Sequence, residues 1–444
     1  MNSIKLTVHL TIISILILAI WAWSYGINVM PGYKLAWLTY KNLLYVSGLL
    51  TMAFLSITIL LATRPTFLEP VFNGLDKIYR LHKWAAIFSI IFAVLHWLIE
   101  MNDDWLESFL FAYGQPTEPT ISGLVENIQE VAEDVGEWGF YMVTAMVMLS
   151  LLKFVPYKFW RYLHRTMPVL YLLLVFHAAW LTPLSWWQQP VGLLLAMLMV
   201  AGSLAAMSSL TGNIGKKRRV QGIIKAVSNN PKNITHVVCQ LDDKWPGHQA
   251  GQFAFVCFNR IEGAHPFTIA NADNNNGELT FAIKALGDYT TNLAQKLTTG
   301  QTVTVEGPYG RFHFKHHGAN TEQIWVAAGI GVTPFLAWLE ELQKQPEQIP
   351  NIQMHYSTHD GRIDPMVARL QYLCDKLPNI TLLIYDSQKG QKITSQNLLI
   401  HDAQKKVTEI WYCGPNGLAK HLKIGLKKIT SGSLHFHQEA FKLR

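Results

Sequence analysis

Long apolar runs fill the first half of the chain and stop near residue 212. A helix rises about 1.5 Å per residue, so about 20 apolar residues cross the roughly 30 Å of hydrocarbon in a bilayer. Six membrane-spanning helices are predicted on this basis, at residues 5–24, 38–62, 82–100, 138–155, 164–182 and 188–210. The stretch WAWSYGINVMPGYK offers no small-residue cleavage site, so the first segment is interpreted as a helix and not as a signal peptide.

After the basic run KKRRV the pattern changes to short alternating strands between Gly, Asn and Pro turns. Five strands are predicted here, at Val220–Val227, Thr235–Leu241, Gln252–Phe258, Thr280–Ala285 and Thr302–Glu306. From Gln323 onward, apolar strands alternate with helical stretches, as in IWVAAG, IQMHYS, TLLIYD and EIWYCG. The predicted fold class is a membrane six-helix bundle followed by an α/β module with an antiparallel β-barrel domain and a doubly wound parallel-sheet domain. The predicted domains are residues 1–212, 217–315 and 320–444.

Charged residues predict the orientation of these helices, because Lys and Arg concentrate in cytoplasmic loops. The basic residues of the predicted loops are Arg64, Lys77 and Arg80, then Lys158 and Arg161, and finally the run GKKRRV. The loop from Met101 to Gly139 instead holds nine acidic residues and no basic one. We therefore predict an integral protein of a plasma or inner membrane with both termini in the cytoplasm. The net charge of +7 is then explained by the cytoplasmic parts and not by a nucleic-acid surface.

The four cysteines, Cys239, Cys257, Cys374 and Cys413, all follow the last predicted membrane helix. On the cytoplasmic side they lie in a reducing environment, where structural disulfides are rare. Their spacing matches neither a zinc site nor a plant-type iron–sulfur site. No disulfide or cysteine-bound metal is therefore predicted.

Four histidines lie within the predicted membrane helices, where a polar side chain is costly and usually has a role. His82 and His96 lie on the third helix, and His164 and His177 lie on the fifth. These helices run in the same direction, so one histidine of each shares the cytoplasmic depth and the other shares the outer depth. A single membrane histidine can equally well bond to a neighbouring helix. Two pairs at matched depths favour axial ligation of two low-spin b-type haems, with these four residues as iron ligands.

One feature of this geometry is less regular. A spacing of fourteen residues returns to nearly the same helix face, whereas the thirteen residues between His164 and His177 do not. Pro168 lies between them and is expected to kink or underwind the fifth helix enough to compensate.

The second half of the chain contains six motifs in a recognisable order. They are HPFTIA (265–270), IKALGDYT (283–290), VEGPYG (305–310), AAGIGVTPF (327–335), YCGP (412–415) and HFHQEAF (435–441). This order resembles that of ferredoxin–NADP reductase type flavoproteins. With the two histidine pairs ahead of it, the whole chain resembles the ferric reductase and NADPH oxidase family of transmembrane flavocytochromes. The resemblance implies that the barrel binds FAD and that the parallel-sheet domain binds NADPH or NADH.

The resemblance also implies site residues. The cofactor-binding residues are His265, Pro266, Phe267, Thr268, Gly287, Thr290, Gly307, Gly329, Gly331, Thr333, Pro334, Gly414 and Pro415. GIGVTP follows an apolar strand and opens a helix, so its amides can meet a pyrophosphate. Cys413 and Phe441 are implied to lie beside the hydride-transfer position, where Phe441 covers the flavin. Three residues follow Phe441, whereas some relatives end at this aromatic.

Two departures from the family pattern concern the substrates. Relatives selective for NADPH often carry an Arg after the second strand of the nucleotide domain, where this chain has His359 and, three residues later, Arg362. NADPH is favoured over NADH, and both stay open. Oxidases of the family tend to have a further histidine one turn beyond the outer ligand, where this chain has Glu100. An acid under an acidic loop suits a cationic or metal-chelate acceptor better than it suits superoxide formation.

The predicted activity follows from these parts. NAD(P)H donates two electrons as hydride and a haem takes one, so a flavin is needed between them. We therefore expect electrons to pass from cytosolic NAD(P)H through FAD and two haems to a small-molecule acceptor outside, with ferric iron favoured. The alternatives are superoxide formation from oxygen, electron supply to a quinone or protein partner, and a scaffold with a degenerate reductase domain. No nucleic-acid partner is expected, and the sequence does not identify a protein partner.

Overall fold

The computed structural model describes residues 3–27, 35–102, 123–152, 155–230, 233–287, 289–314, 321–344, 349–398, 407–429 and 433–439. By their contacts the residues form two compact units. The first, the helical unit, consists of Met1–Leu68 and Lys77–Ile214, and the second, the reductase unit, consists of Glu69–Asp76 and Gly215–Arg444.

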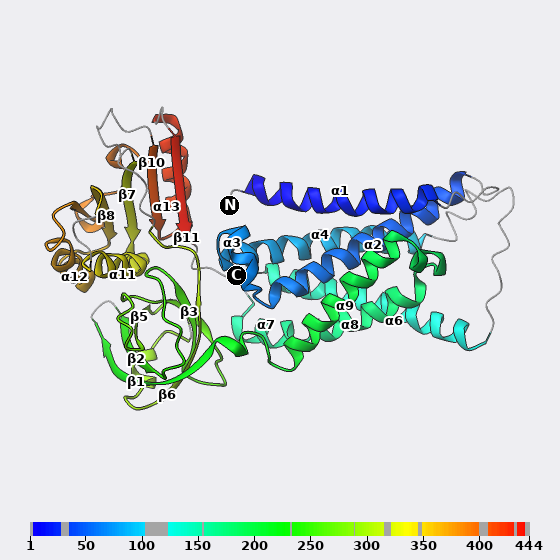
Figure 1. Cartoon of the computed structure of the whole chain (residues 1–444), viewed down its shortest axis with the longest axis horizontal. Coiled ribbons are helices and arrows are strands. Elements are labelled where there is room, and N and C mark those ends of the chain that lie inside the picture. The colour runs from blue at the N-terminus through cyan, green and yellow to red at the C-terminus, as the bar shows by residue number, and fades with distance from the viewer. Residues whose placement is uncertain are drawn as a thin grey trace. The chain divides into compact units, whose positions relative to one another are not determined.

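Helices make up the helical unit, and most of them are long (Figure 1). They are α1 (Ser3–Ile27), α2 (Leu35–Ala62), α4 (Leu75–Met101), α6 (Leu124–Leu151), α7 (Tyr157–His164), α8 (Met167–Leu181) and α9 (Pro190–Leu210). Helix α6 packs on α8 and α2 packs on α9. Among the described residues, three helices are long and apolar enough to cross a membrane, namely Leu38–Ala62, Leu75–Met101 and Pro190–Leu210, and Val8–Ser24 is a shorter apolar stretch. Six spans and the orientation of the termini therefore stay predictions.

The predicted fifth membrane helix is interrupted in the structure. Helix α7 ends at His164 and α8 begins at Met167, so the expectation of one helix over residues 164–182 is wrong. The break has a local cause, because Pro168 lies in the first turn of α8, where proline lacks the N–H that a continuous helix needs. In place of the kink expected at Pro168, a two-residue turn at Arg165 and Thr166 separates the two helices.

The first part of the reductase unit is an antiparallel six-stranded sheet. Its strands are β1 (Arg219–Asn229), β2 (Ile234–Leu241), β3 (Phe253–Cys257), β4 (His265–Thr268), β5 (Glu278–Lys284) and β6 (Thr302–Tyr309), in the order β4-β3-β6-β1-β2-β5. A bridge between Ile269 and Phe281 joins the two edge strands, so the predicted barrel is observed as a nearly closed sheet. Alternate residues such as Val220 and Ile224 on β1 point into its core. The short helix α10 (Leu293–Lys296) packs against β1 and β2.

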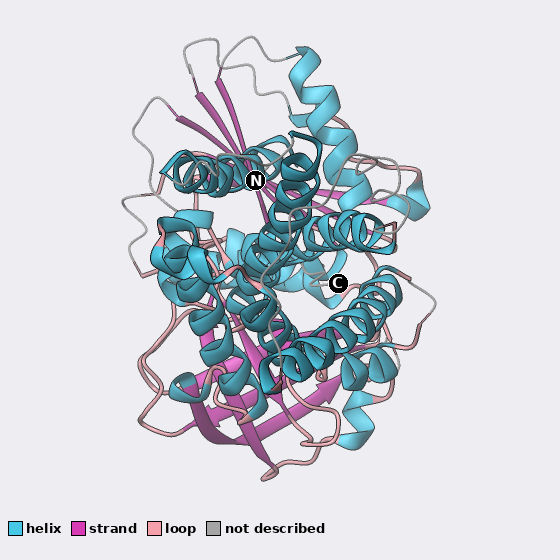
Figure 2. Ribbon diagram, turned by 90° about the vertical axis from the view of Figure 1, so that its right-hand side faces the viewer, coloured by secondary structure: helices cyan, strands magenta, loops and turns pink. Residues whose placement is uncertain are grey.

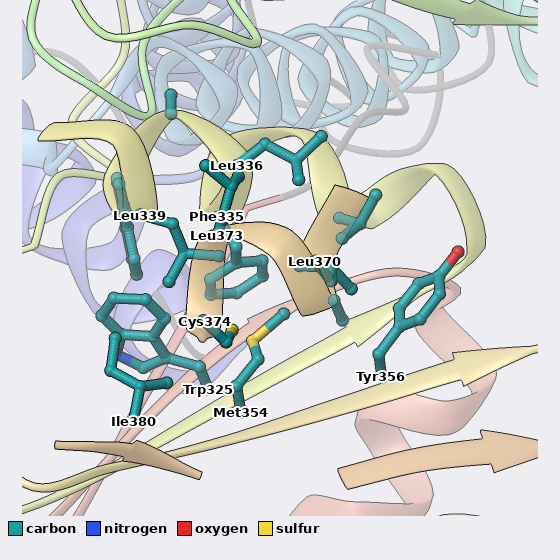
Figure 3. Close-up of a cluster of buried hydrophobic side chains, with 14 of the residues drawn as sticks. Trp325, Phe335, Leu336, Leu339, Met354, Tyr356, Leu370, Leu373, Cys374 and Ile380 are labelled. Atoms are coloured by element: carbon teal, nitrogen blue, oxygen red, sulfur yellow. The ribbon is translucent and has the colours of Figure 1, made fainter. Parts of the chain in front are cut away.

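The second part is a five-stranded parallel sheet, separate from the first in Figure 2. Its strands are β7 (Thr321–Ala328), β8 (Ile352–Thr358), β9 (Ile380–Asp386), β10 (Val407–Cys413) and β11 (Ser433–Glu439), in the order β11-β10-β7-β8-β9. Helices α11 (Thr333–Leu342) and α12 (Pro365–Cys374) cover one face, and α13 (Asn416–Ile429) packs on the other. Figure 3 shows side chains such as Phe335, Leu370 and Trp325 filling the space between the sheet and α11 and α12. This is the predicted doubly wound arrangement.

Candidate functional site

His82 and His164 face each other in the helical unit. Their ring centroids lie 6.2 Å apart, with the ring planes at 75°. Nδ1 of His82 lies 2.8 Å from the carbonyl oxygen of Thr58 on α2. Because a carbonyl oxygen only accepts, Nδ1 must carry the proton, and Nε2 keeps a free lone pair. Nδ1 of His164 is buried and has no hydrogen-bond partner among the residues described, while Trp160 stacks on its ring at 5.0 Å.

His96 and His177 form a second pair of the same kind. Their ring centroids lie 6.4 Å apart, with the planes at 87°. Nδ1 of His96 lies 3.0 Å from the carbonyl oxygen of Leu44, and Nδ1 of His177 lies 2.7 Å from that of Ala132. Both carbonyls fix the tautomer in which Nε2 is the available ligand atom. Metal-binding histidines usually donate their other ring N–H to such a carbonyl, which holds the ring in the orientation needed for ligation.

The spacing of the two pairs fits a metal ion between the rings. Two imidazoles that share one metal ion through bonds of about 2 Å have their centroids about 6 Å apart. Both observed separations agree with this distance. The four predicted ligands are thus brought together in the predicted pairs, and the chemistry and geometry of these residues fit two bis-histidine haem sites.

Two glycines make room for the second pair. A β-carbon on Gly136 of α6 would lie 2.1 Å from Nδ1 of His177, which is closer than any real contact. A β-carbon on Gly48 of α2 would lie 3.1 Å from Cε1 of His96. The backbones of α2 and α6 therefore approach the imidazoles closely enough to hold both rings from the side opposite the pair.

The predicted FAD residues lie on and beside β4. His265, Pro266, Phe267 and Thr268 form this strand, which pairs with β3. The hydroxyl of Thr268 is buried and has no hydrogen-bond partner in the described part of the chain. An unsatisfied buried hydroxyl is costly, so this atom fits a ligand that supplies a polar atom there, as a flavin ring would.

The ring of His265 stacks on that of Tyr289 with the centroids 4.1 Å apart. Beside Tyr289 opens a cavity of about 220 Å³, lined by Asn259, Glu262 and Lys296 among others. Burial raises the pKa of the Tyr289 hydroxyl, and its oxygen is another buried atom without a hydrogen-bond partner among the described residues. The cavity adds room for a polar ligand next to the predicted FAD strand.

The GDYT turn is organised by its own threonine. The hydroxyl of Thr290 accepts from the amides of Leu286 at 2.9 Å and Gly287 at 3.2 Å. A β-carbon on Gly287 would meet open space, so this position leaves the backbone accessible. The predicted role of Thr290 as a direct phosphate donor stays a prediction, because in the structure its hydroxyl closes the turn.

The carboxyl ends of β7 and β10 bring the nucleotide motifs together. Residues Ala327 and Cys413 are paired neighbours in the sheet, so GIGVTP and YCGP lie side by side. A β-carbon on Gly331 would lie 2.3 Å from the carbonyl oxygen of Cys413, and one on Gly414 would lie 2.9 Å from the Ala328 side chain. Only glycine permits this approach. Ligands of open α/β sheets bind at this edge.

The remaining nucleotide residues lie at the same edge. Gly329 has a left-handed backbone with φ of 56°, and Thr333 and Pro334 begin α11. The carbonyl of Pro415 accepts from the Tyr412 hydroxyl at 2.7 Å, which fixes the turn after β10. Gly307 lies in β6, where a β-carbon would be 3.2 Å from the side chain of Ala254.

Cys413 and Glu439 form a buried pair, of which the sequence motifs predicted only Cys413. They are register partners at the ends of β10 and β11, with exposures of 0% and 6%. Burial and the neighbouring Glu439 raise the pKa of the Cys413 thiol well above its usual value, so the thiol stays protonated. Sequence reasoning missed Glu439, and the signal was its place in HFHQEAF, two residues before the predicted aromatic. Phe441 itself lies outside the described residues.

The two residues considered for the choice between NADPH and NADH lie after the end of β8. Nδ1 of His359 lies 3.2 Å from the Ser387 hydroxyl at the end of β9. The Arg362 side chain is 76% exposed, and its Nε lies 3.5 Å from the largely buried Asp360. A solvent-exposed guanidinium at this edge is available to a phosphate, which agrees with the preference for NADPH without deciding it.

Exposed acidic side chains lie on the two helices that contact or carry the second histidine pair. One face of α6 carries exposed acids spaced three or four residues apart, about one helical turn. They are Glu126, Glu130, Glu133 and Glu137. The same part of α6 contacts His177 through Ala132 and Gly136. Glu100 is exposed near the end of α4, one turn beyond His96. Much of the acidic loop itself, residues 103–122, lies outside the described residues.

Comparison with known proteins gives two family matches. Residues 47–175 match the ferric reductase like transmembrane component, and residues 220–313 match the FAD-binding domain. The first match includes His82, His96 and His164 and ends two residues before His177. The matched residues thus include three of the four paired histidines and nearly all of the six-stranded sheet.

Three curated proteins show how far the similarity extends. The anthranilate 1,2-dioxygenase electron transfer component of Acinetobacter baylyi is 21% identical over 52% of this chain and 69% of its own length. Dual oxidase 2 of Sus scrofa is 22% identical over 88% of this chain and 29% of its own. Respiratory burst oxidase homolog protein E of Arabidopsis thaliana is 27% identical over 44% of this chain and 22% of its own. The chain therefore spans less than a third of the two oxidases.

Proposed function

Because the chain belongs to the ferric reductase and NADPH oxidase family, we propose that it carries electrons across a membrane from NAD(P)H to an acceptor on the opposite side. The family combines a ferric reductase like transmembrane component with an FAD-binding reductase domain, and both are matched here. The chemistry supplied by bound FAD is the conversion of a two-electron hydride into single electrons, and that supplied by b-type haem is one-electron transfer.

The two histidine pairs are the observation that carries this proposal. His82 with His164 would hold one haem, and His96 with His177 would hold the other. In three of the four residues a backbone carbonyl fixes Nδ1 as the donor and leaves Nε2 for iron. A purely structural membrane histidine needs no second imidazole at metal-sharing distance, so the pairing supports ligation.

The residues of the reductase unit have separate tasks in this proposal. Thr268 offers its buried hydroxyl to the flavin ring, and Gly287 lets the FAD pyrophosphate approach the backbone. Gly329, Gly331 and Gly414 admit the nicotinamide nucleotide at the edge of the parallel sheet. Cys413 and Glu439 line the place of hydride transfer, where a protonated thiol presents no negative charge to the incoming hydride. Phe441 is proposed to cover the flavin until nicotinamide arrives.

Ferric iron, as a chelate or another cationic form, is the acceptor we favour. The exposed acids lie on α6, which contacts His177, and at Glu100 on α4, one turn beyond His96, and such a group of carboxylates attracts cations. Oxygen is the second candidate, because a relative that aligns with 88% of the chain is a dual oxidase. A quinone or a protein partner is a further alternative. In that case the purified protein should show no turnover with soluble acceptors.

The test uses the purified full-length protein in proteoliposomes. NADPH or NADH is added on the reductase side, and haem reduction is followed by absorbance while ferric chelate, oxygen or a quinone is supplied on the other side. We expect about two low-spin b-type haems per chain, reduced by NAD(P)H and reoxidised fastest by ferric chelate. Replacing His96 with Ala should abolish acceptor reduction while FAD is still reduced. Full haem content in that variant would contradict the assignment.

A further inference from the structure

One of the four paired histidines is held differently from the other three. Nδ1 of His82, His96 and His177 each lies within hydrogen-bond distance of a backbone carbonyl on a neighbouring helix. Nδ1 of His164 is buried and has no hydrogen-bond partner in the part of the chain that the structure describes. A metal-binding histidine normally uses this second hydrogen bond to fix the orientation of its ring. The ring of His164 must therefore be held by another contact.

The place of His164 in the chain increases the need for such a contact. It is the last residue of α7, which is only eight residues long, and α8 begins three residues later. The other three histidines lie inside the longer helices α4 and α8. Because the last turn of a helix lacks part of its backbone hydrogen bonds and frays readily, the backbone restrains His164 less than the others.

The indole of Trp160, one helical turn before His164, covers one side of the imidazole. The ring centroids lie 5.0 Å apart and the ring planes differ by 23°, which is a stacked arrangement. A flat partner at this distance restricts the rotation of the imidazole, because turning the ring would drive its edge into the indole. Stacking thus limits the same motion that a hydrogen bond to Nδ1 would limit.

Trp160 is itself held by another helix. Its Nε1 donates to Oγ of Ser150 at 2.8 Å, and this hydroxyl donates to the carbonyl oxygen of Met146 at 2.8 Å. The hydroxyl proton is used by Met146, so the Ser150 oxygen accepts from the indole. Ser150 lies in the last turn of α6, the helix whose Ala132 carbonyl holds His177. Helix α6 therefore supports a histidine of each pair, one directly and one through Trp160.

Tryptophans near membrane surfaces often serve only as anchors, with the indole N–H among the lipid headgroups. Here the N–H is bonded to a serine of a neighbouring helix, and the indole is partly buried. The adjacent Phe159 is 58% exposed and is better placed for such an anchoring role. The contacts of Trp160 are thus directed at α6 and at the imidazole.

We infer that Trp160 is a positioning residue of the His82–His164 site: its ring, fixed by Ser150, holds the imidazole of His164 in the orientation needed for ligation, in place of the missing hydrogen bond to Nδ1. The inference rests on the proposed function for the presence of haem. Every contact that it uses lies within the helical unit.

The experiment compares full-length wild type with Trp160→Leu, Trp160→Phe, Ser150→Ala and the double variant of the last two. Leucine removes both the flat ring and the N–H, whereas phenylalanine keeps a flat ring without the N–H. Phe159→Leu is the matched control, because it removes the neighbouring aromatic ring on the same helix. Each change is also made in His96→Ala, in which the His82–His164 site is expected to hold the one remaining haem.

Two properties are measured in each protein. The first is the low-field EPR signal of the ferric haem, whose position depends on the angle between the planes of its two imidazole ligands. The second is the rate at which haem transfers to an excess of apomyoglobin, which reports how firmly each site holds its haem. Neither measurement needs NAD(P)H or an electron acceptor.

For Trp160→Leu we expect a shifted EPR signal from the His82–His164 site and transfer of its haem on the order of 10- to 100-fold faster, as when the support of a metal ligand is removed. The other haem should keep its signal and its transfer rate. Trp160→Phe and Ser150→Ala should cause smaller and equal changes. The double variant should show no larger change than either, because both remove the same hydrogen bond. Phe159→Leu should resemble wild type.

An unchanged signal and transfer rate in Trp160→Leu would overturn the inference. Equal changes at both haems, or the same change in Phe159→Leu, would also overturn it, because they would indicate a general loosening of the helices. If Trp160→Leu does not fold, the milder variants decide, since additive effects of Trp160→Phe and Ser150→Ala would show that the two residues act separately. Wild type without haem would contradict the proposed function itself, whereas two haems in wild type and in all variants with normal properties would contradict only the role of Trp160.

Discussion

Replacing one glycine of α6 tests the haem assignment without touching any proposed ligand. A β-carbon on Gly136 would lie 2.1 Å from Nδ1 and 2.3 Å from Cε1 of His177. Ordinary contacts between such atoms are about 3.5 Å, so the imidazole must move by more than about 1 Å in Gly136→Ala. Metal–ligand distances tolerate only about 0.2 Å. The variant is therefore expected to lose iron binding at the His96–His177 site.

The assay measures haem and FAD per chain in the purified full-length protein. Gly136→Ala should contain about half of the wild-type haem, with FAD unchanged, because the His82–His164 site lies elsewhere in the unit. Gly139→Ala is the matched control on the same helix. Its β-carbon would lie 2.8 Å from a terminal carbon of Leu174, and a flexible leucine can move aside. This control should keep the full haem content.

The comparison of the two variants decides between explanations. Loss in Gly136→Ala alone supports ligation by His177, because both variants add one methyl group to α6. Equal loss in both would mean that α6 packing, and not the imidazole, was disturbed. Full haem content with an unchanged spectrum in Gly136→Ala would falsify the reasoning, since His177 cannot keep its place beside that methyl group.

Three further predictions concern the reductase unit and the acceptor. Gly331→Ala should raise the KM for NAD(P)H in dye reduction on the order of 10- to 100-fold with FAD retained, because its β-carbon would lie 2.3 Å from the Cys413 carbonyl oxygen. Iodoacetamide at pH 8 should label the partly exposed Cys257 before the buried Cys413, whose raised pKa keeps the thiol neutral; mass spectrometry of labelled peptides checks this, and faster labelling of Cys413 would contradict it. Glu100→Gln should slow the reduction of ferric chelate but not that of haem. Glu100→His should raise superoxide formation relative to ferric chelate reduction. An equal ratio of these two products in wild type and both variants would show that Glu100 does not choose the acceptor.

The parts of the fold that the sequence predicted correctly depend on local patterns. The switch from apolar helices to alternating strands near residue 216 appears where β1 begins, because strand and helix periods are properties of neighbouring residues. The pairing of the four histidines was predicted from their depth in the membrane. That depth follows from how far along its helix each histidine lies. Strand β11 was recognised only as a motif, since SLHFHQE alternates too weakly to signal a parallel edge strand.

Contacts between distant segments were beyond such patterns. Glu439 and Cys413 are 26 residues apart and meet only because β11 pairs in parallel with β10. Here an acid that looks like ordinary surface charge in the sequence is buried by the tertiary structure, so burial was the missing information.

The break at Arg165 and Thr166 shows how a local defect solves a problem of geometry. In one straight helix, His164 and His177 would point in different directions, because thirteen residues do not complete a whole number of turns. Ending α7 at His164 and restarting at Met167 uncouples the two rotations, so each histidine can face its partner on α4 independently. On α4 the spacing is fourteen and no break is needed, and that helix is continuous from Leu75 to Met101. The interruption before Pro168 therefore compensates for the thirteen-residue spacing, which was the irregular feature of the haem hypothesis.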